Sequence, residues 1–361
     1  MMNKVYRWLA MALVNNKSFK GFFEPLVQLL FPLWTVGAYR AKLIKIRDEN
    51  KDVYSLILKV SKYWKGFKAG QYVEINVEKD GVSLSRVFSI SSAPSLYEKS
   101  GVIELTIRKQ QQGRITPWLY GTLKKGRFIN ISAAKGDFII NNVKSSLLLI
   151  AGGSGITPLR SMISEALQSQ QAADIHLLYY SHNFDHLFAQ ELQQQAETQQ
   201  GLSVSFVNSG QSGRICLAHL KQYCPDFKNR VSYICGPTGM IQASKQLLLD
   251  NNVVQEDIHY EYFGPAPIVN LDVETSGTVV FNQSSIEVES TGYKVQSLLE
   301  IAESAGLSPI TGCRMGICHQ CICQKQQGVV YNTLTKVFSD TGSGEVQLCI
   351  SVPVGNVTLN L

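Results

Sequence analysis

The chain has 361 residues, of which 45% are hydrophobic and 17% are charged, a composition typical of a globular protein with two or three domains. The net charge of +6 originates in one segment, because residues 1–51 contain nine Lys or Arg against three Asp or Glu. This distribution excludes the widespread basic surface that nucleic-acid binding requires, so we expect no nucleic-acid partner. No secretory signal is recognised, and we expect a cytoplasmic protein.

The first 37 residues are both basic and apolar, and we interpret them as an amphipathic N-terminal extension. In a helix over 3–14, two basic side chains share one face and four apolar side chains share another: Lys4 and Arg7, and Val5, Trp8, Leu9 and Ala12. The apolar run 22–36 is interrupted by polar residues and prolines, so it is a poor candidate for a spanning helix, which needs roughly 20 apolar residues. Two alternatives stay open: peripheral contact with the inner face of a membrane or with a partner, and packing against the protein's own core.

The pattern of apolar residues divides the rest of the chain into three domains and a linker. Residues 38–142 contain short alternating runs typical of a sandwich or barrel, at 54–60, 72–77, 86–90, 102–108 and 128–132. Residues 143–263 alternate buried strands with helices, which predicts a parallel α/β sheet, with strands at 147–150, 175–180, 203–208 and 231–235 and helices at 159–168, 187–199 and 240–250. Residues 264–276 are interpreted as a linker, and 277–361 as a third domain with strands near 278–281 and 285–288 and a helix near 295–304.

Four of the eight cysteines lie within positions 313–323, which favours metal ligands over disulfides in an intracellular chain. The spacing of Cys313, Cys318, Cys321 and the later Cys349 is that of plant-type [2Fe–2S] ligands. Glycines 312 and 316 would let backbone N–H groups approach the sulfurs. Cys323 breaks this spacing and is not expected to be a ligand. A structural zinc site is the alternative, but it usually shows paired Cys-x-x-Cys sequences.

Two short sequences suit a flavin. In the first, Arg86 could neutralise a pyrophosphate, Phe88 could cover a ring and Ser89 could bond to the flavin edge. The second precedes a predicted helix at 118–123, whose N-terminus favours phosphate; its candidate residues are Gly113, Arg114 and Thr116.

A glycine-rich turn after the predicted strand 147–150 suits a pyridine nucleotide, because it lets the backbone approach a pyrophosphate at the start of a helix. Its candidate residues are Gly152, Gly153, Gly155, Thr157 and Pro158. The second predicted strand is followed by Ser181 and His182, where an acid would bind a ribose 2′-hydroxyl and an Arg would bind a 2′-phosphate. Neither is present, and we expect a weak preference for NADPH over NADH.

These sequences, in this order, resemble the ferredoxin–NADP reductase superfamily over residues 39–263, and residues 311–361 resemble a plant-type ferredoxin domain. The resemblance implies an antiparallel flavin-binding β-barrel, an α/β nucleotide-binding domain and an α+β, β-grasp-like ferredoxin domain. It implies FAD as the cofactor, although some relatives with a C-terminal ferredoxin use FMN. It places Ser89, Cys235 and Glu261 near the hydride path, and Gly236, Pro237 and Phe263 near the cofactors. Phe88 replaces the Tyr that is common in the family.

The resemblance also implies a function: NAD(P)H reduces the flavin, the flavin reduces the [2Fe–2S] cluster, and the cluster reduces an external acceptor. The expected acceptor is a membrane di-iron fatty-acid desaturase or hydroxylase. One alternative is a soluble ring-hydroxylating or demethylating oxygenase. An alternative of another class is a redox sensor or electron-carrier module without NAD(P)H turnover.

Overall fold

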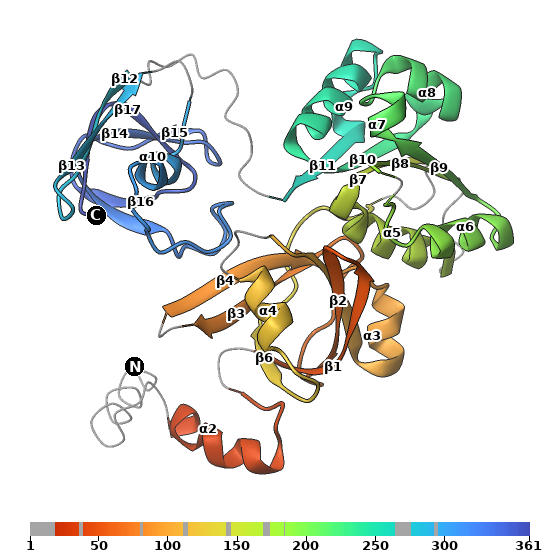
Figure 1. Ribbon diagram of the computed structural model, residues 1–361, viewed down its shortest axis with the longest axis horizontal. Helices are drawn as coiled ribbons and strands as arrows, with labels where there is room; N and C mark the ends of the chain where they lie inside the picture. The colour runs from red at the N-terminus through yellow and green to blue at the C-terminus, as the bar shows by residue number, and fades with distance from the viewer. Residues whose placement is uncertain are drawn as a thin grey trace. The chain divides into compact units, whose positions relative to one another are not determined.

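A computed structural model describes residues 19–35, 39–79, 82–110, 115–141, 146–168, 174–183, 185–263, 276–291 and 295–361 (Figure 1). The chain forms two compact units. The first contains the residues up to Val77 together with Val87–Glu261, and the second contains Glu78–Arg86 together with Tyr262–Leu361. The predicted helix at 3–14 and most of the predicted linker lie outside the described residues.

The first sheet of the chain is antiparallel where its register is defined, and its strands are β1 (Tyr39–Asn50), β2 (Val53–Val60), β3 (Tyr72–Lys79), β4 (Val82–Ser89), β5 (Val102–Arg108) and β6 (Phe128–Ile131). Their order is β4-β3-β6-β1-β2-β5. A bridge between Ile90 and Leu105 joins the two ends of this order, so the sheet curls toward a barrel. Its core includes alternating inward residues of β2 and β5 such as Leu56, Leu58 and Ile103. Helices α3 (Pro94–Ser100) and α4 (Thr116–Thr122) complete it.

The second sheet has the order β11-β10-β7-β8-β9, with parallel pairing from β10 through β9. Its strands are β7 (Leu147–Gly152), β8 (Ile175–Ser181), β9 (Leu202–Asn208), β10 (Val231–Gly236) and β11 (Ile258–Tyr262). The helices are α5 (Ile156–Gln168), α6 (Ala189–Thr198), α7 (Ser209–Ser212), α8 (Leu217–Tyr223) and α9 (Thr238–Asp250). Figure 1 shows α5 and α6 on one face of the sheet and α8 and α9 on the other. Because both faces are covered, all six residues of β7 are buried.

The order of this sheet reverses between β7 and β10. The chain moves outward from β7 to β8 and β9, and then returns to place β10 on the other side of β7. In open α/β sheets, ligands bind at the carboxyl ends of the strands at such a reversal. We therefore expect a ligand to bind at the turns after β7 and β10.

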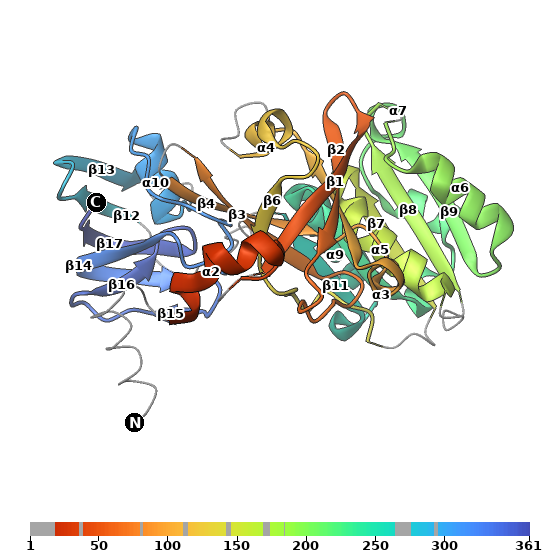
Figure 2. The ribbon, with the colours of Figure 1, turned by 90° about the horizontal axis from the view of Figure 1, so that it is seen from below.

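The third sheet belongs to the C-terminal unit and is mixed, with the order β13-β12-β17-β14-β15 and β16 paired to β14. Its strands are β12 (Ser276–Phe281), β13 (Ile286–Thr291), β14 (Ile322–Asn332), β15 (Val337–Phe338), β16 (Gly344–Gln347) and β17 (Ser351–Leu359). Helix α10 (Leu298–Ser304) lies on one face (Figure 2). A capping box between Ser297 and Glu300 starts this helix three residues later than predicted, and its apolar side chains join the core of the sheet.

Near the N-terminus, helix α2 (Phe19–Leu30) ends in a turn stabilised by side chains. Gln28 Nε2 donates to Glu24 Oε1 at 2.7 Å and to the carbonyl of Trp34 at 3.0 Å. Several of its large apolar side chains are more than half exposed: Leu26, Leu29, Leu30 and the following Phe31. None of the helices in the described ranges is both long and apolar enough to cross a membrane.

Candidate functional site

The turns after β7 and β10 touch each other, and glycines make this contact possible. A Cβ on Gly155 would overlap the carbonyl oxygen of Cys235, closer than real Cβ atoms approach. A Cβ on Gly152 would lie 2.5 Å from Met240 Sδ and 2.7 Å from Pro237 Cδ. The predicted glycine-rich turn and the Cys235–Pro237 segment therefore form one structure at the reversal of the sheet.

Hydrogen bonds fix the shape of the glycine-rich turn. Thr157 Oγ1 donates to the carbonyl of Ser154 at 3.0 Å, and the buried Tyr179 hydroxyl donates to the carbonyl of Gly153 at 2.9 Å. Gly153 has φ +54°, a conformation that suits glycine. Helix α5 begins directly after the turn, with Pro158 in its first turn, so its N-terminus is presented where an anion would bind.

Arg108, which the sequence did not single out, lies next to this turn. It ends β5, and its Nη2 atom is 3.6 Å from the place a Cβ on Gly153 would take. Its positive charge also acts on the hydroxyl of Tyr179. A guanidinium beside a helix N-terminus suits a pyrophosphate. Only the fold could reveal this, because the two residues belong to different sheets.

Ser89, Cys235 and Glu261 come from three different strands, and the structure brings them together. The Ser89 hydroxyl donates to the carboxyl group of Glu261, and this carboxyl group, when ionised, acts on the Cys235 thiol. Burial raises the pKa of Glu261 to about 8, and the bond from Ser89 opposes this only partly. Burial also raises the pKa of Cys235, so it is a neutral thiol and not an activated nucleophile.

The residues of this cluster fit a flavin. Oε2 of Glu261 is buried and, within the described part of the chain, has no hydrogen-bond partner. A buried polar atom of this kind is expected to have one, and a ring with polar edges would supply it. Phe88 is half-buried one residue before Ser89. Phe263, the aromatic that the resemblance places near the flavin, is 46% exposed.

The second flavin sequence is only partly described. Gly113 and Arg114 lie outside the described residues. Thr116 begins α4, where its hydroxyl accepts the Gln110 N–H at 2.9 Å and its carbonyl accepts the Tyr54 hydroxyl at 2.8 Å. These bonds anchor the start of the helix to the barrel.

Arg86, which the sequence predicts to bind the flavin pyrophosphate, contacts backbone carbonyls of its own strand and of the cysteine loop. Its Nη1 atom donates to the carbonyls of Ser85, at 2.8 Å, and of Gly312. Gly312 precedes the first predicted cluster cysteine, and both residues belong to the second compact unit. No sequence signal could have shown this bond, because it spans 226 positions.

The predicted sugar-binding positions lie at the end of β8, beside the short helix α7. Ser209 Oγ donates to the carbonyl of Ser181 at 3.2 Å. A Cβ on Gly210 would lie 2.7 Å from the carbonyl oxygen of His182. The segment after β9 therefore shares this corner with the segment after β8, which the sequence did not indicate.

The four predicted cluster cysteines form two pairs. Cys321 Sγ lies 3.2 Å from Cys349 Sγ. Cys318 Sγ accepts the Cys313 N–H at 3.1 Å, and the two thiols of this pair are hydrogen-bonded. In the described ranges, no three His, Cys, Asp or Glu side chains gather as ligands of a single metal ion. Two pairs of thiols are the donor set of a two-iron cluster, in which each iron takes two thiolates.

Backbone amides surround one of these sulfurs. Cys313 Sγ accepts the N–H groups of Met315, Ile317 and Cys318 at 3.3–3.4 Å. The bond from the Cys318 thiol, together with these amides, lowers the pKa of Cys313. A Cβ on Gly312 would overlap Cys318 Sγ, so only glycine fits there. The loop is thus shaped to hold thiolates.

Cys323 faces a different direction. Its Sγ contacts the carbonyls of Asn360, at 3.7 Å, and Gln324, at 3.8 Å, and burial raises its pKa. This supports its exclusion from the ligand set.

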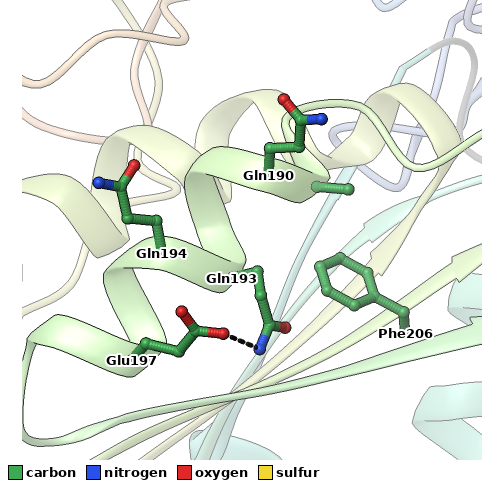
Figure 3. Close-up of a pocket in the computed structure, with 6 residues that line it drawn as sticks. Gln190, Gln193, Gln194, Glu197 and Phe206 are labelled. Atoms are coloured by element: carbon green, nitrogen blue, oxygen red, sulfur yellow. Dashed lines mark hydrogen bonds between the residues drawn. The ribbon is translucent and has the colours of Figure 1, made fainter.

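A surface hollow of about 420 Å³ lies over α6 and β9 (Figure 3). It is lined by Ala189, Gln190, Gln193, Gln194, Glu197 and Phe206. It contains none of the predicted site residues.

Comparisons with known proteins agree with this geometry. Residues 40–140 match the oxidoreductase FAD-binding domain family, and residues 149–246 match the oxidoreductase NAD-binding domain family. The chain therefore contains an FAD-binding and an NAD-binding oxidoreductase domain, and it is an NAD(P)H-dependent oxidoreductase.

Similar proteins extend over most of the chain. An NADPH oxidoreductase of Mycobacterium tuberculosis is 29% identical, covering 93% of this chain and 87% of its own. A glycine betaine monooxygenase reductase subunit of Pseudomonas aeruginosa is 28% identical, covering 91% of this chain and 96% of its own. The solved structure of phthalate dioxygenase reductase has a TM-score of 0.59 at 19% identity and covers 90% of this chain and 98% of its own, which shows the fold.

Proposed function

We propose that this chain passes electrons from NAD(P)H through FAD to a [2Fe–2S] cluster and on to an external oxygenase or desaturase. The observation that carries the proposal is the pairing of Cys313 with Cys318 and of Cys321 with Cys349 in a chain that also contains FAD- and NAD-binding domains. When bound, the flavin takes a hydride and the cluster carries single electrons, so together they link a two-electron donor to a one-electron acceptor. A redox sensor without NAD(P)H turnover would not need the intact nucleotide turn.

In this proposal, the protein binds and orients the nucleotide. The N-terminus of α5 and the Arg108 guanidinium hold the pyrophosphate, while Gly152 and Gly155 let the turn lie close to Cys235. The buried thiol of Cys235 and the carboxyl of Glu261 form the wall against which nicotinamide and flavin would meet. With a pKa of about 8, Glu261 keeps its proton at neutral pH and adds no negative charge to this wall.

We further propose the domain boundaries 38–142 for the FAD-binding barrel, 143–263 for the NAD(P)H-binding domain and 277–361 for a ferredoxin domain. The mixed sheet with α10 on one face supports the third assignment. In it, Cys313 and Cys318 would hold one iron, and Cys321 and Cys349 the other.

Two kinds of acceptor are favoured by different observations. Several relatives are reductases of oxygenases, including the glycine betaine monooxygenase reductase subunit and a 3-ketosteroid-9-alpha-monooxygenase reductase component of Mycobacterium tuberculosis. The exposed Leu29, Leu30 and Phe31 of the α2 region, in a basic N-terminal segment, instead favour an acceptor at an anionic membrane, such as a desaturase.

Flotation with anionic liposomes distinguishes the two kinds of acceptor. We expect the wild type to float and a Leu29→Glu, Leu30→Glu variant to stay at the bottom. A wild type that stays at the bottom would favour an oxygenase in solution.

The electron path itself is tested in anaerobically purified protein. We expect stoichiometric FAD, a visible and reduced-state EPR signal of a [2Fe–2S] cluster, and bleaching of both chromophores by NAD(P)H. A chain that binds flavin but shows no cluster signal after reconstitution with iron and sulfide would contradict the proposal.

A further inference from the structure

Arg160, in the second turn of α5, has no role in the function proposed so far, and its guanidinium makes contacts on two sides. On one side, Nε and Nη2 donate to the two carboxylate oxygens of Glu191, each at 2.8 Å, and the guanidinium carbon lies 4.1 Å from the centre of the Phe188 ring. On the other side, Nη1 donates to the carbonyl of Ser91 at 3.1 Å and lies 3.5 Å from Glu104 Oε1. The first two partners lie in the NAD-binding domain, and the other two lie in the FAD-binding domain.

The partners in the FAD-binding domain are close to the flavin strand. Ser91 follows the predicted flavin residue Ser89 by two positions, and its N–H donates to the carbonyl of Glu104 at 2.8 Å. The next residue of α5 adds a second bond of this kind, because the hydroxyl of the fully buried Ser161 donates to the carbonyl of Ser92 at 2.6 Å. Two consecutive residues of α5 therefore bind two consecutive carbonyls of the segment that continues β4.

The partners in the NAD-binding domain belong to the segment that follows β8. Phe188 has φ +61°, a left-handed conformation that is uncommon for a residue other than glycine. The N–H of Leu187 donates to the Tyr179 hydroxyl at 3.1 Å, and this hydroxyl donates in turn to the carbonyl of Gly153 at 2.9 Å. Arg160 thus contacts a segment that is also hydrogen-bonded to the glycine-rich turn.

This contact is shielded from water, and protein atoms complete it. The side chains of Arg160 and Glu104 are 12% and 8% exposed, so their charges interact more strongly than those of a surface pair. All three nitrogen atoms of the guanidinium have protein partners, so no cofactor is needed to satisfy them. If Arg160 is replaced, Glu104 keeps Arg47 as a partner, and Glu191 is 35% exposed and can be solvated. A variant therefore leaves no buried carboxylate unpaired and should fold.

We propose that Arg160 is a positioning residue for hydride transfer, because it fixes the NAD-binding domain against the FAD-binding barrel. This rests on the proposed function only in its first step, in which a hydride with its two electrons passes from NAD(P)H to FAD. The pyrophosphate of the coenzyme is expected at the start of α5, within one domain, whereas the meeting of nicotinamide and flavin depends on the placement of both domains. Loss of Arg160 should therefore slow hydride transfer more than it weakens coenzyme binding.

The test uses full-length protein with bound FAD. Anaerobic stopped-flow measures the limiting rate of FAD reduction by NADPH and by NADH, together with the dissociation constant of each coenzyme, and hydrogen exchange reports on the contact itself. Arg160→Met should lower the limiting rate by about tenfold or more and change the dissociation constant less, because small misplacements of reacting groups are costly. Amides of the segments 90–93 and 187–192 should exchange faster than in the wild type, because they lose their common partner.

Arg230→Met is the matched control. The Arg230 guanidinium is also buried, and it pairs with Asp174 and Asp226, but all of these residues lie in the NAD-binding domain. This variant should lower the temperature of thermal unfolding and leave the limiting rate of FAD reduction unchanged.

The outcomes separate this inference from the proposed function. A wild type whose FAD is reduced by neither coenzyme would contradict the proposed function. A wild type that is reduced, beside an Arg160→Met variant with the same limiting rate or with unchanged exchange in both segments, would overturn this inference alone. Equal losses of rate in Arg160→Met and Arg230→Met would assign the effect to a general loosening of the domain and would also overturn it.

A second variant keeps the test open if Arg160→Met is isolated without FAD. Ser161→Ala removes only the neighbouring bond to the carbonyl of Ser92 and should also lower the limiting rate. A wild-type rate in Ser161→Ala would then overturn the inference.

Discussion

The nucleotide end of the parallel sheet and the cysteine loop are built in opposite ways. The first gathers Ser89, Cys235 and Glu261 from strands that are far apart in sequence, and the topology of two sheets places them together. The second is largely local, because Cys313 and Cys318 are wrapped by the amides of their own loop. The nucleotide site therefore depends on contacts between segments that are far apart in sequence. The cysteine loop depends mainly on the cysteine side chains themselves.

Replacing a ligand should have the largest effect. Changing Cys313, Cys318, Cys321 or Cys349 individually to Ser should abolish the visible and EPR signals of the cluster, because each sulfur belongs to one of the two pairs. Cys323→Ser is the control, since its Sγ faces the carbonyl of Asn360, and it should retain both signals. Loss of the cluster from the Cys323 variant, with retention in a Cys321 variant, would reverse the assignment.

Adding a single methyl group should disturb the nucleotide site, because this site depends on close contact between segments that are far apart in sequence. Gly155→Ala would place a Cβ against the carbonyl of Cys235, so we expect a loss of about 1–3 kcal/mol in the free energy of unfolding and weaker NAD(P)H binding. Gly239→Ala in α9 is the control, because nothing lies within 4 Å of the added Cβ. Thermal unfolding and nucleotide titration of both variants check this. Equal behaviour of the two would show that the turns after β7 and β10 do not touch as described.

This difference also explains how much the sequence could predict. The spacing of the cysteines and the residues 147–158 are local, so the ligand set and the nucleotide turn follow from short patterns. The strands β2 to β10, β12 and β13 and the helices α4, α5, α6, α9 and α10 were predicted for the same reason, because alternation and apolar runs are local. The strands β11 and β14 to β17 and the helices α2, α3, α7 and α8 were not predicted. The long strand β1 was not delimited as an element of its own, because its many polar residues weaken the alternation.

Contacts between distant segments could not be predicted in this way. Arg108 beside Gly153 and Ser209 beside Ser181 join segments that only the sheet order brings together. The resemblance to a family supplied Ser89, Cys235 and Glu261, but it did not supply the bond from Arg86 to Gly312.

The buried carboxyl of Glu261 should make stability depend on pH. Its pKa is about 8 in the folded protein against the ordinary 4.5, so between these values the folded state holds a proton that the unfolded chain has lost. The free energy of unfolding should therefore fall as pH rises from about 4.5 to about 8, by about 1.4 kcal/mol per unit at most.

The variant Glu261→Gln should flatten this dependence, because it cannot titrate. The exposed Glu256→Gln, from the turn just before β11, should keep the wild-type slope. Denaturant unfolding at several pH values between 5 and 8.5 checks both. A slope that survives in Glu261→Gln would assign the dependence to another group.

The smallest effect is expected for the choice of coenzyme. Neither an acid nor an Arg follows β8 directly, and the corner holds Ser181, His182 and the neighbouring Ser209. We predict a modest preference for NADPH in the wild type. His182→Asp should shift the ratio of kcat/KM values toward NADH by about tenfold, because a carboxylate accepts a hydrogen bond from a free 2′-hydroxyl and repels a 2′-phosphate.

Asn183→Asp is the control, because it adds the same charge one position further from the strand, and it should change the ratio less. Steady-state kinetics with both coenzymes decide the matter, and a strong NADH preference in the wild type would contradict the prediction at once. An equal shift in both variants would mean that only net charge matters here, and that the end of β8 does not contact the ribose.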